Sequence, residues 1–433
     1  MSPALVAVAI VAVTYVLIIA DRMDRSIIAL LGGGAMILAG VLTQAEAIRG
    51  IDFNTLALLT GMMVLVSITR RCGVYEFLAI WSAQKARASP AGIMLMLALV
   101  TAIISAVLNN VTTVLLVAPV TLSIARRLGI APFPFLFVEV MASNIGGAAT
   151  LIGDPPNMLI GSAAGLSFND FVLGLTPVIL VVMACQAALC HLIWGRSLGA
   201  SDAARAEVMA LEARTAVADW RLLKQSVSVL AVVLLALVLE RQIGLEPGSI
   251  ALFGAAVLML LDNIAHHREM QTQKVTEAYG DIDWIMIFFF VGLFIVVHGL
   301  EQTGIIAALG RTLVASVHGN LTVAVFVVLW ASAFLSAFMD NIPFVAAMIP
   351  LIRAIAPSLG GDEALVPLWW ALSLGACLGG NGTLIGASAN LTAAGMAQRE
   401  GVAFGFALYS RYAAPLTLVS LALCSLYLWL RYL

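Results

Sequence analysis

The chain has 433 residues, of which 62% are hydrophobic and 11% are charged, and its mean hydropathy is +1.05. Soluble domains carry roughly 25% charged residues, so this composition excludes a soluble globular protein and indicates an integral membrane protein embedded in a lipid bilayer. The net charge of −2 predicts no nucleic-acid partner, and the five cysteines show neither pairing nor CxxC spacing, so we expect no disulfide framework, metal site or cofactor.

The first half of the chain is predicted to contain five membrane crossings. Each is an apolar stretch long enough to cross a bilayer as a helix, and they cover 3–20, 27–43, 53–71, 132–160 and 171–195. Between the third and fourth crossings, segment 91–125 has two apolar arms that meet at Asn109 and Asn110. These arms form either two more crossings or a re-entrant hairpin whose tip stops at mid-membrane. Amphipathic helices along the membrane surface are expected at 74–88 and at 305–318.

The fourth crossing is interrupted by the motif NIGGAATLIGDPPNMLIG, residues 144–161. A plain membrane helix would not carry it, because each proline removes a backbone donor and a carboxylate is costly in lipid. The glycines allow the helix to unwind and other backbone to approach closely. Asp154 can cap the half-helix that follows, with Pro155 and Pro156 in its first turn. We therefore predict a broken helix that exposes carbonyls and a helix N-terminus at membrane depth.

The second half of the chain repeats the first. An offset of 231 places Ile51-Asp52-Phe53 on Ile282-Asp283-Trp284 and Asn110 on Asn341. An offset of 233 then places Thr150-Leu151-Ile152-Gly153 on Thr383-Leu384-Ile385-Gly386. Such a repeat indicates one structural unit used twice. The predicted parts are a first repeat at 1–195, a polar cytoplasmic linker at 196–221 and a second repeat at 222–433.

The charge distribution favours hairpins and an inverted second repeat. With hairpins at 91–125 and 322–356, each repeat has five crossings, and an odd number inverts the second repeat relative to the first. Lysine and arginine gather on the cytoplasmic side of membrane proteins. With the N-terminus outside, 17 of the 22 basic residues lie inside, and the others are Arg49, Arg241, Arg311, Arg353 and Arg431. The predicted fold is all-α, with about ten transmembrane helices, two re-entrant hairpins and two broken helices, which is the architecture of secondary transporters.

Two acids are predicted to couple transport to an ion. The repeat places Asn109 on Asp340 and Asp154 on Ala387, so each symmetry-related pair keeps one carboxylate. Removal from water disfavours the charged form of a carboxylate, so a proton is an alternative occupant to a cation such as Na⁺. We interpret Asp154 and Asp340 as coupling acids; in the alternative interpretation both only cap helices. Glu139, in the first broken helix, is either a third coupling acid or the partner of an interfacial arginine.

The hairpin tips and breaks resemble one family. They read SAVLNNVTTVLLVAP, NIGGAATLIGDPPN, SAFMDNIPFVAAMIP and GGNGTLIGASAN. They resemble the ion-transporter superfamily that holds arsenite-efflux permeases, the melanosomal P protein, sodium/proton antiporters of the NhaD type, and sodium-coupled citrate and dicarboxylate carriers. The resemblance covers nearly the whole chain outside the linker. It implies two hairpins and two unwound helices around a central site, an elevator motion and a homodimer.

The resemblance also implies which residues bind the solute and the ion. The hairpin tips supply Asn109, Asn110, Asp340 and Asn341. The unwound helices supply Gly146, Gly147, Thr150, Gly153, Asp154, Asn157, Gly379, Gly380, Thr383 and Asn390. The hairpin tips of carboxylate carriers usually read Ser-Asn-Thr, and neither tip here does, which disfavours sodium-coupled dicarboxylate uptake.

The favoured function is efflux of a metalloid oxyacid, arsenite or antimonite, by proton antiport across the inner (plasma) membrane. A site rich in amides and hydroxyls suits a small neutral inorganic solute. Its only basic candidate at membrane depth is Arg353, which follows the second hairpin and lies either at that depth or at the surface. Sodium/proton antiport is the first alternative, because carbonyls and Asp154 would also suit sodium. A sodium-coupled carboxylate or other small-anion carrier is the second.

Other classes of protein fit the sequence less well. An intramembrane aspartyl protease needs a GxGD element, and Leu151 occupies the place of its first glycine, so no enzyme is expected. The sequence has no GxxxxGK[ST] phosphate loop, so ATP hydrolysis would require a separate soluble ATPase partner docked on the linker. A channel would need a continuous selectivity filter, which the sequence does not show.

Overall fold

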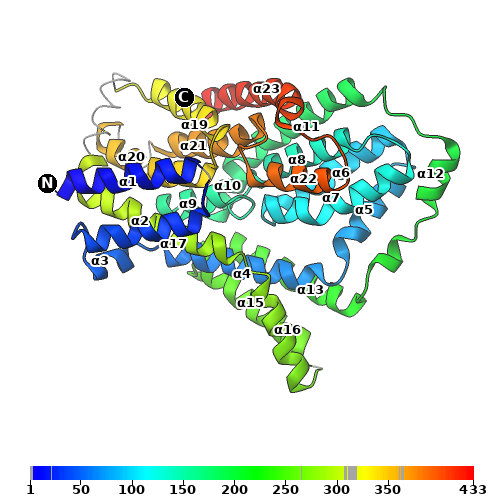
Figure 1. The fold of residues 1–433 in the computed structure, drawn as a ribbon, viewed down its shortest axis with the longest axis horizontal. Coiled ribbons are helices and arrows are strands. Elements are labelled where there is room, and N and C mark those ends of the chain that lie inside the picture. The colour runs from blue at the N-terminus through cyan, green and yellow to red at the C-terminus, as the bar shows by residue number, and fades with distance from the viewer. Residues whose placement is uncertain are drawn as a thin grey trace.

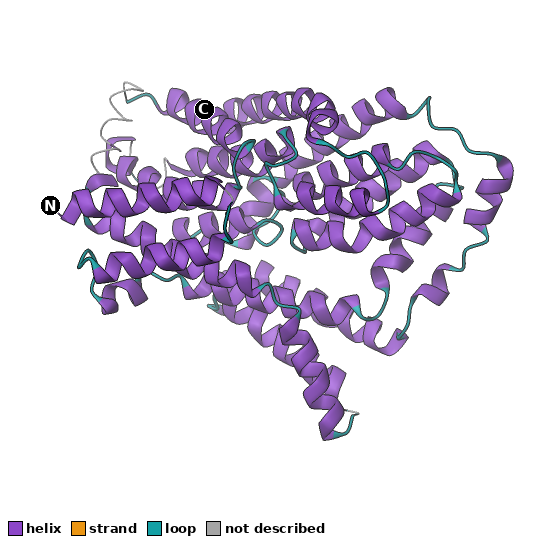
Figure 2. Cartoon of the chain, in the orientation of Figure 1, coloured by secondary structure: helices purple, strands orange, loops and turns teal. Residues whose placement is uncertain are grey.

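A computed structural model describes residues 3–20, 22–264, 266–306, 310, 319–359, 361 and 365–433. Within these ranges the chain is helical, without strands (Figure 2). The first repeat contains α1 (Pro3–Ala20), α2 (Arg25–Leu38), α3 (Gln44–Arg49), α4 (Phe53–Arg70), α5 (Val74–Lys85), α6 (Pro90–Ser105), α7 (Asn110–Arg127), α8 (Phe133–Gly147), α9 (Pro155–Ala164), α10 (Phe168–Gly174) and α11 (Thr176–Trp194).

The linker and the second repeat complete the chain. The linker holds α12 (Asp202–Met209) and the short 3₁₀ helix η1 (Ala213–Ala216). The second repeat contains α13 (Trp220–Val238), α14 (Glu240–Ile243), α15 (Pro247–Asn263), α16 (Arg268–Gly280), α17 (Trp284–Gln302), α19 (Leu321–Ser336), α20 (Asn341–Leu359), α21 (Val366–Gly379), η3 (Gly380–Gly382), α22 (Ser388–Arg399) and α23 (Phe406–Tyr432).

Six of the described helices are long and apolar enough to cross a membrane unaided: α1, α4, α11, α13, α17 and α23. Each has at least 18 residues, and a helix of that length spans about 27 Å, close to the thickness of the hydrocarbon core. The shorter apolar helices include α2, α15, the hairpin arms α6, α19 and α20, and the first broken-helix arm α8. The expectation of an all-α, multi-pass membrane protein is confirmed.

The two hairpins enter the molecule from opposite ends (Figure 1). Helices α6 and α7 lie toward the end that carries the linker helix α12, whereas α19 and α20 lie toward the end with the N-terminus. The broken helices show the same relation, since α9 lies toward the N-terminal end and α22 toward the linker end. The repeats are therefore inverted, as the sequence predicts.

The helices form two bodies, and each body contains helices of both repeats. The scaffold body consists of α1, α2, α4, α13, α15 and α17, in which α2 packs against α17 and α4 against α15. Both pairs approach very closely: a Cβ atom added to Gly292 would lie 2.3 Å from the carbonyl carbon of Ala29, and one on Gly61 would lie 2.5 Å from that of Ala251. The hairpin body consists of the hairpins, the broken helices, α11 and α23.

Matching acids begin matching helices in the scaffold body. The Asp52 side chain accepts from Thr55 N at 3.1 Å at the start of α4, and Asp283 accepts from Met286 N at 2.9 Å at the start of α17. Helix α5 occupies the segment expected to form a surface helix at 74–88. Its expected counterpart at 305–318 lies outside the described residues, apart from 305, 306 and 310.

Candidate functional site

The first broken helix has the predicted form. Helix α8 ends at Gly147, and α9 begins at Pro155 with both prolines in its first turn. The loop between them is held by side chains, because Asn157 Nδ2 donates to Thr150 O at 2.9 Å and the Thr150 hydroxyl donates to Ala106 O. The break is thus a defined polar structure tied to the first hairpin.

The second broken helix repeats this geometry. Asn390 Nδ2 donates to the Thr383 and Gly380 carbonyls, each at 2.9 Å, and the Thr383 hydroxyl donates to Ala337 O. Asn157 and Asn390 therefore play the same part in the two repeats. Both asparagines are fully buried.

The glycines of the breaks allow close backbone packing. A Cβ atom on Gly153 would lie 2.5 Å from Gly147 O, and one on Gly386 would lie 2.6 Å from Gly380 O. A Cβ atom on Gly146 would lie 2.2 Å from Ala102 O in α6, and its equivalent Gly379 meets α19 in the same way. We assign these glycines to the packing of each break against its hairpin.

The two broken helices meet through their asparagines. The Asn157 Oδ1 atom accepts from Ser373 Oγ at 2.6 Å and lies 3.6 Å from Cys377 Sγ, and both partners come from α21. The Asn390 Oδ1 atom accepts from Asn144 Nδ2 of α8 at 2.9 Å. The offset of 233 places Asn144 on Cys377, so the two contacts are symmetry-related.

Asn144 connects two further elements and was not among the predicted site residues. It accepts from Asn110 Nδ2 at the first hairpin tip at 3.0 Å, and its own Nδ2 atom also donates to Asn381 Oδ1 at 2.8 Å. Asn381 was missed as well. The available signal was the residue type, because an amide in an apolar helix needs a buried partner.

Asp154 lies at the centre of the site but does not cap α9. It is 1% exposed, it occupies the N-cap position, and its side chain makes no capping hydrogen bond. Its Oδ2 atom has no hydrogen-bond partner among the described residues. Cys377 and Asn341 are polar neighbours of the carboxyl group. The expected capping role is therefore wrong, because the carboxyl group turns toward the second repeat.

Asp340 does cap its helix and is ion-paired. Its Oδ1 atom accepts from Ile342 N at 3.3 Å, and its Oδ2 atom accepts from Ser388 Oγ at 3.2 Å and from the Arg25 guanidinium. Arg353, the basic candidate from the sequence, is exposed and donates to Ala163 O, so it has the surface position that the sequence left open. The basic side chain that reaches the second hairpin tip is Arg25, which was not among the predicted site residues.

Glu139 lies in α8 away from this cluster. It is 1% exposed, and neither of its carboxylate oxygens has a hydrogen-bond partner among the described residues. The Thr121 side chain of α7 is its polar neighbour. No arginine pairs with it in the described part of the chain, so the alternative of an arginine partner is not supported.

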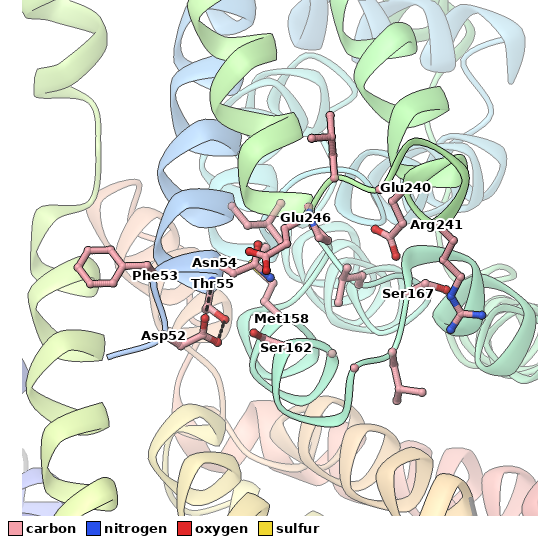
Figure 3. A pocket seen from close by; sticks show the side chains of 18 of the residues that line it. Asp52, Phe53, Asn54, Thr55, Met158, Ser162, Ser167, Glu240, Arg241 and Glu246 are labelled. Carbon is pink, nitrogen blue, oxygen red and sulfur yellow. Dashed lines mark hydrogen bonds between the residues drawn. The ribbon is translucent and has the colours of Figure 1, made fainter. Parts of the chain in front are cut away.

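Three of the cavities lie between the two bodies. A cavity of about 550 Å³ lies between α9 and the scaffold, lined among others by Asp52, Ser162 and Glu240 (Figure 3). A second, of about 170 Å³, reaches Asn109, which caps α7 and does not join the asparagine cluster. A third, of about 530 Å³, is lined by Asp340 and Arg25. The hairpin tips are thus accessible from cavities, whereas Asp154 is enclosed.

A family model described as a citrate transporter (CitMHS) matches residues 15–375. The chain belongs to this family. An uncharacterized transporter of Mycobacterium tuberculosis is 42% identical over 431 residues, which is 99% of this chain and 98% of that protein. The human P protein is 32% identical over 504 residues, covering 98% of this chain and 59% of that protein. The predicted resemblance to this transporter group is confirmed.

Solved structures share the fold at low sequence identity. The YdaH transporter of Alcanivorax borkumensis matches with a TM-score of 0.63 at 15% identity, over 99% of this chain and 97% of that one. MtrF of Neisseria gonorrhoeae, described in its structure report among antimetabolite efflux pumps, matches with a TM-score of 0.60 at 13% identity, over 92% and 84%. The chain therefore has the fold and family of a membrane transporter.

Proposed function

We propose that the chain is a secondary active transporter of the plasma membrane that exports a small uncharged metalloid acid, arsenous or antimonous acid, in exchange for protons. The observation that carries this proposal is the enclosed carboxyl group of Asp154, whose Oδ2 atom is unpartnered within the described residues. A charged carboxylate without a counter-ion is expensive in such a place, whereas a protonated one is not. Asp154 is thus suited to take up and release a proton.

The surroundings of Asp154 support a neutral solute. The polar groups of the central cluster include the amides of Asn110, Asn341 and Asn157 and the hydroxyl of Ser373. The basic side chain nearest the second hairpin tip, Arg25, is already paired with Asp340. Hydroxyl groups on a neutral acid can exchange hydrogen bonds with amides without requiring a fixed positive charge.

A carboxylate substrate is the second candidate. Two observations favour it: the family model is described as a citrate transporter, and Arg25 lines the 530 Å³ cavity at the second hairpin tip. An anion that displaced Asp340 from Arg25 would gain a charge-assisted hydrogen bond. Either substrate is compatible with an elevator motion of the hairpin body against the scaffold body in a homodimer, which we also propose.

Flux in proteoliposomes tests the proposal. Arsenite uptake into inside-out vesicles should rise with an imposed proton gradient and should not respond to a sodium gradient. Asp154→Asn should remove the response to the proton gradient, because an amide keeps the size but cannot release a proton. Asp52→Asn, at a cap in the scaffold body, is the matched control and should behave as wild type.

The outcomes separate the candidates. Proton-driven citrate flux without arsenite flux would replace the metalloid by a carboxylate. Sodium flux driven by protons, without either solute, would indicate sodium/proton antiport. Proton-driven flux of normal size in Asp154→Asn would refute the assignment of Asp154 as coupling acid and would move that role to Asp340 or Glu139.

A further inference from the structure

One ion pair joins the two bodies at the second hairpin tip. Arg25 belongs to the first turn of α2 in the scaffold body, and Asp340 precedes α20 in the hairpin body. Beside it, the Tyr15 hydroxyl of α1 donates to Pro343 O of α20 at 2.9 Å. These contacts lie where the two bodies must separate if one moves against the other.

Each partner of the pair is fixed to its own body. The Arg25 guanidinium lies over the Phe289 ring of α17, 5.2 Å from the ring centroid, so α2 and α17 hold it together. Asp340 is held by the backbone N–H of Ile342 and by the Ser388 hydroxyl of α22. A relative movement of the bodies would therefore have to break the pair rather than carry it along.

The pair is also more sheltered than most other ion pairs among the described residues. The side chains of Arg25 and Asp340 are 24% and 21% exposed, against 61% and 40% for Arg126 and Glu400. Breaking a sheltered pair leaves two poorly hydrated charges, which is unfavourable. Breaking it after Asp340 has accepted a proton leaves only one charge, and that charge faces the adjoining cavity.

The other repeat has no such connection. Gly61 and Gly292 correspond in the repeat, so their contact partners Ala251 and Ala29 correspond as well. This aligns α2 with α15 at an offset of 222 and places Arg25 on Pro247. Asp340 corresponds to the neutral Asn109. Both charges of the pair are thus absent from the symmetry-related place, so the ion pair acts on one hairpin only.

We propose that Arg25 makes movement of the hairpin body depend on occupation of Asp340. When Asp340 is ionised and binds neither a proton nor the solute, its ion pair with Arg25 holds the second hairpin against α2. A proton on Asp340 removes the negative charge, Arg25 keeps its own, and the hairpin is released. A solute hydroxyl that donates to Asp340 competes with Arg25 in the same way, so either the proton or the solute permits movement, which makes the exchange obligatory.

This inference rests on the proposed proton coupling and adds a positioning residue to it. The titratable groups that face Asp340 are Tyr15 from α1, Asp24 from the preceding turn, Arg25 from α2 and Asp154 from the first repeat. The carboxylate of Asp24 is engaged at the start of α2, because it accepts hydrogen bonds from the backbone N–H and the hydroxyl of Ser26. Asp154 is enclosed, so protons from the cavity reach Asp340 first.

A distance measurement tests the inference without any substrate. Spin labels on Leu38→Cys at the end of α2 and Leu418→Cys on α23 report the separation of the bodies, since both positions are exposed. Cys185, the half-buried native cysteine, is changed to serine. In nanodiscs, pulsed EPR of the wild-type background should show two distances between the labels. The population of the second distance should increase as pH falls, because protonation of Asp340 releases the hairpin.

Variants at the pair give distinct expectations. Arg25→Gln should raise the population of the second distance at neutral pH at least tenfold and abolish its pH dependence, and Asp340→Asn should do the same. Arg25→Lys retains the charge and should stay close to wild type, which also shows that the position tolerates substitution. Arg22→Gln, an exposed arginine three residues away, is the charge control.

The result that would overturn the inference is a pH-dependent second distance in Arg25→Gln equal to that of wild type. Pulsed EPR distances that do not respond to pH in wild type would overturn it as well, even if proton-driven arsenite flux were intact. If the distances behave as expected but no arsenite is carried, the inference stands and the proposed substrate fails.

Discussion

Asn144 of the first repeat donates to Asn390 of the second at 2.9 Å, and its symmetry-related counterpart Cys377 lies 3.6 Å from Asn157. The same crossing of broken helices is therefore made once by a strong amide hydrogen bond and once by a weak thiol contact supported by Ser373. The amide of Asn390 has protein hydrogen-bond partners on both its oxygen and its nitrogen. Asn157, in contrast, follows Asp154, whose Oδ2 atom has no partner among the described residues. We infer that the Asn144–Asn390 contact is structural, and we propose that the coupling ion binds at the Asn157 contact.

Asn144→Ala should destabilise the protein and abolish transport. It removes hydrogen bonds to Asn110, Asn381 and Asn390, and each buried polar group left without a partner costs about 1–3 kcal/mol. We expect a clearly lower melting temperature in detergent. Cys377→Ala is the matched control and should melt close to wild type, because the thiol makes only weak contacts, with Asn157 and with Asp154. Equal melting of Asn144→Ala and wild type would contradict the structural role.

Gly153→Ala and Gly386→Ala should each stop transport while the protein still inserts in the membrane. The added Cβ atoms would lie 2.5 Å and 2.6 Å from backbone oxygens, which cannot move aside as a flexible side chain can. Gly395→Ala in α22 is the control, since nothing lies within 4 Å of its Cβ position. Vesicle flux, normalised to the amount of inserted protein, measures the effect. Normal flux in both variants would show that the breaks tolerate more space than the structure allows.

The linker and α3 should lie on opposite sides of the membrane. A cysteine at Glu212, which is exposed in the linker, should react with an impermeant thiol reagent only from the cytoplasmic side. One at Ala45, exposed in α3, should react only from outside. Labelling of both positions in intact cells would refute the predicted topology.

Glu240 should make stability depend on pH. Burial raises the pKa of Glu240, which accepts from Phe168 N at 3.0 Å, above its ordinary value. The folded protein then binds a proton more tightly than the unfolded chain, so stability falls as pH rises through the ordinary pKa toward the raised one. The melting temperature of wild type relative to Glu240→Gln should decrease as pH rises above about 4, the ordinary pKa of a glutamate side chain. Parallel melting curves across this range would contradict the assignment.

The sequence predicted the parts of the fold that local chemistry determines. If a helix contains the two prolines after Asp154, they fit only in its first turn. The repeated Thr-Leu-Ile-Gly motif then identified the second break from the first. The odd number of crossings per repeat then gave the inverted arrangement. In each case, neighbouring residues or the internal repeat contained the information.

The contacts of the site were harder to predict because they join distant segments. Arg25 and Asp340 are 315 positions apart, and Asn144 and Asn390 are 246 apart. The Asp154 carboxyl group could cap α9 by sequence, but packing against α21 decides its direction. Residue type identified the polar groups, and only the packing of the two repeats determined which of them meet.

The close contacts of Ala29 with Gly292 and of Gly61 with Ala251 have a consequence for synthesis of the chain. Each contact joins a helix made early to a helix made late, and small residues at such an interface give close packing only when both helices are present. While the ribosome is still translating the second half, α2 and α4 must remain in lipid with these faces uncovered. Neither half can form the scaffold body alone. When the two halves are produced as separate chains, each should therefore be degraded if it is expressed without the other, and both should accumulate if they are expressed together. The repeat is a unit of sequence, but it is not a unit of folding.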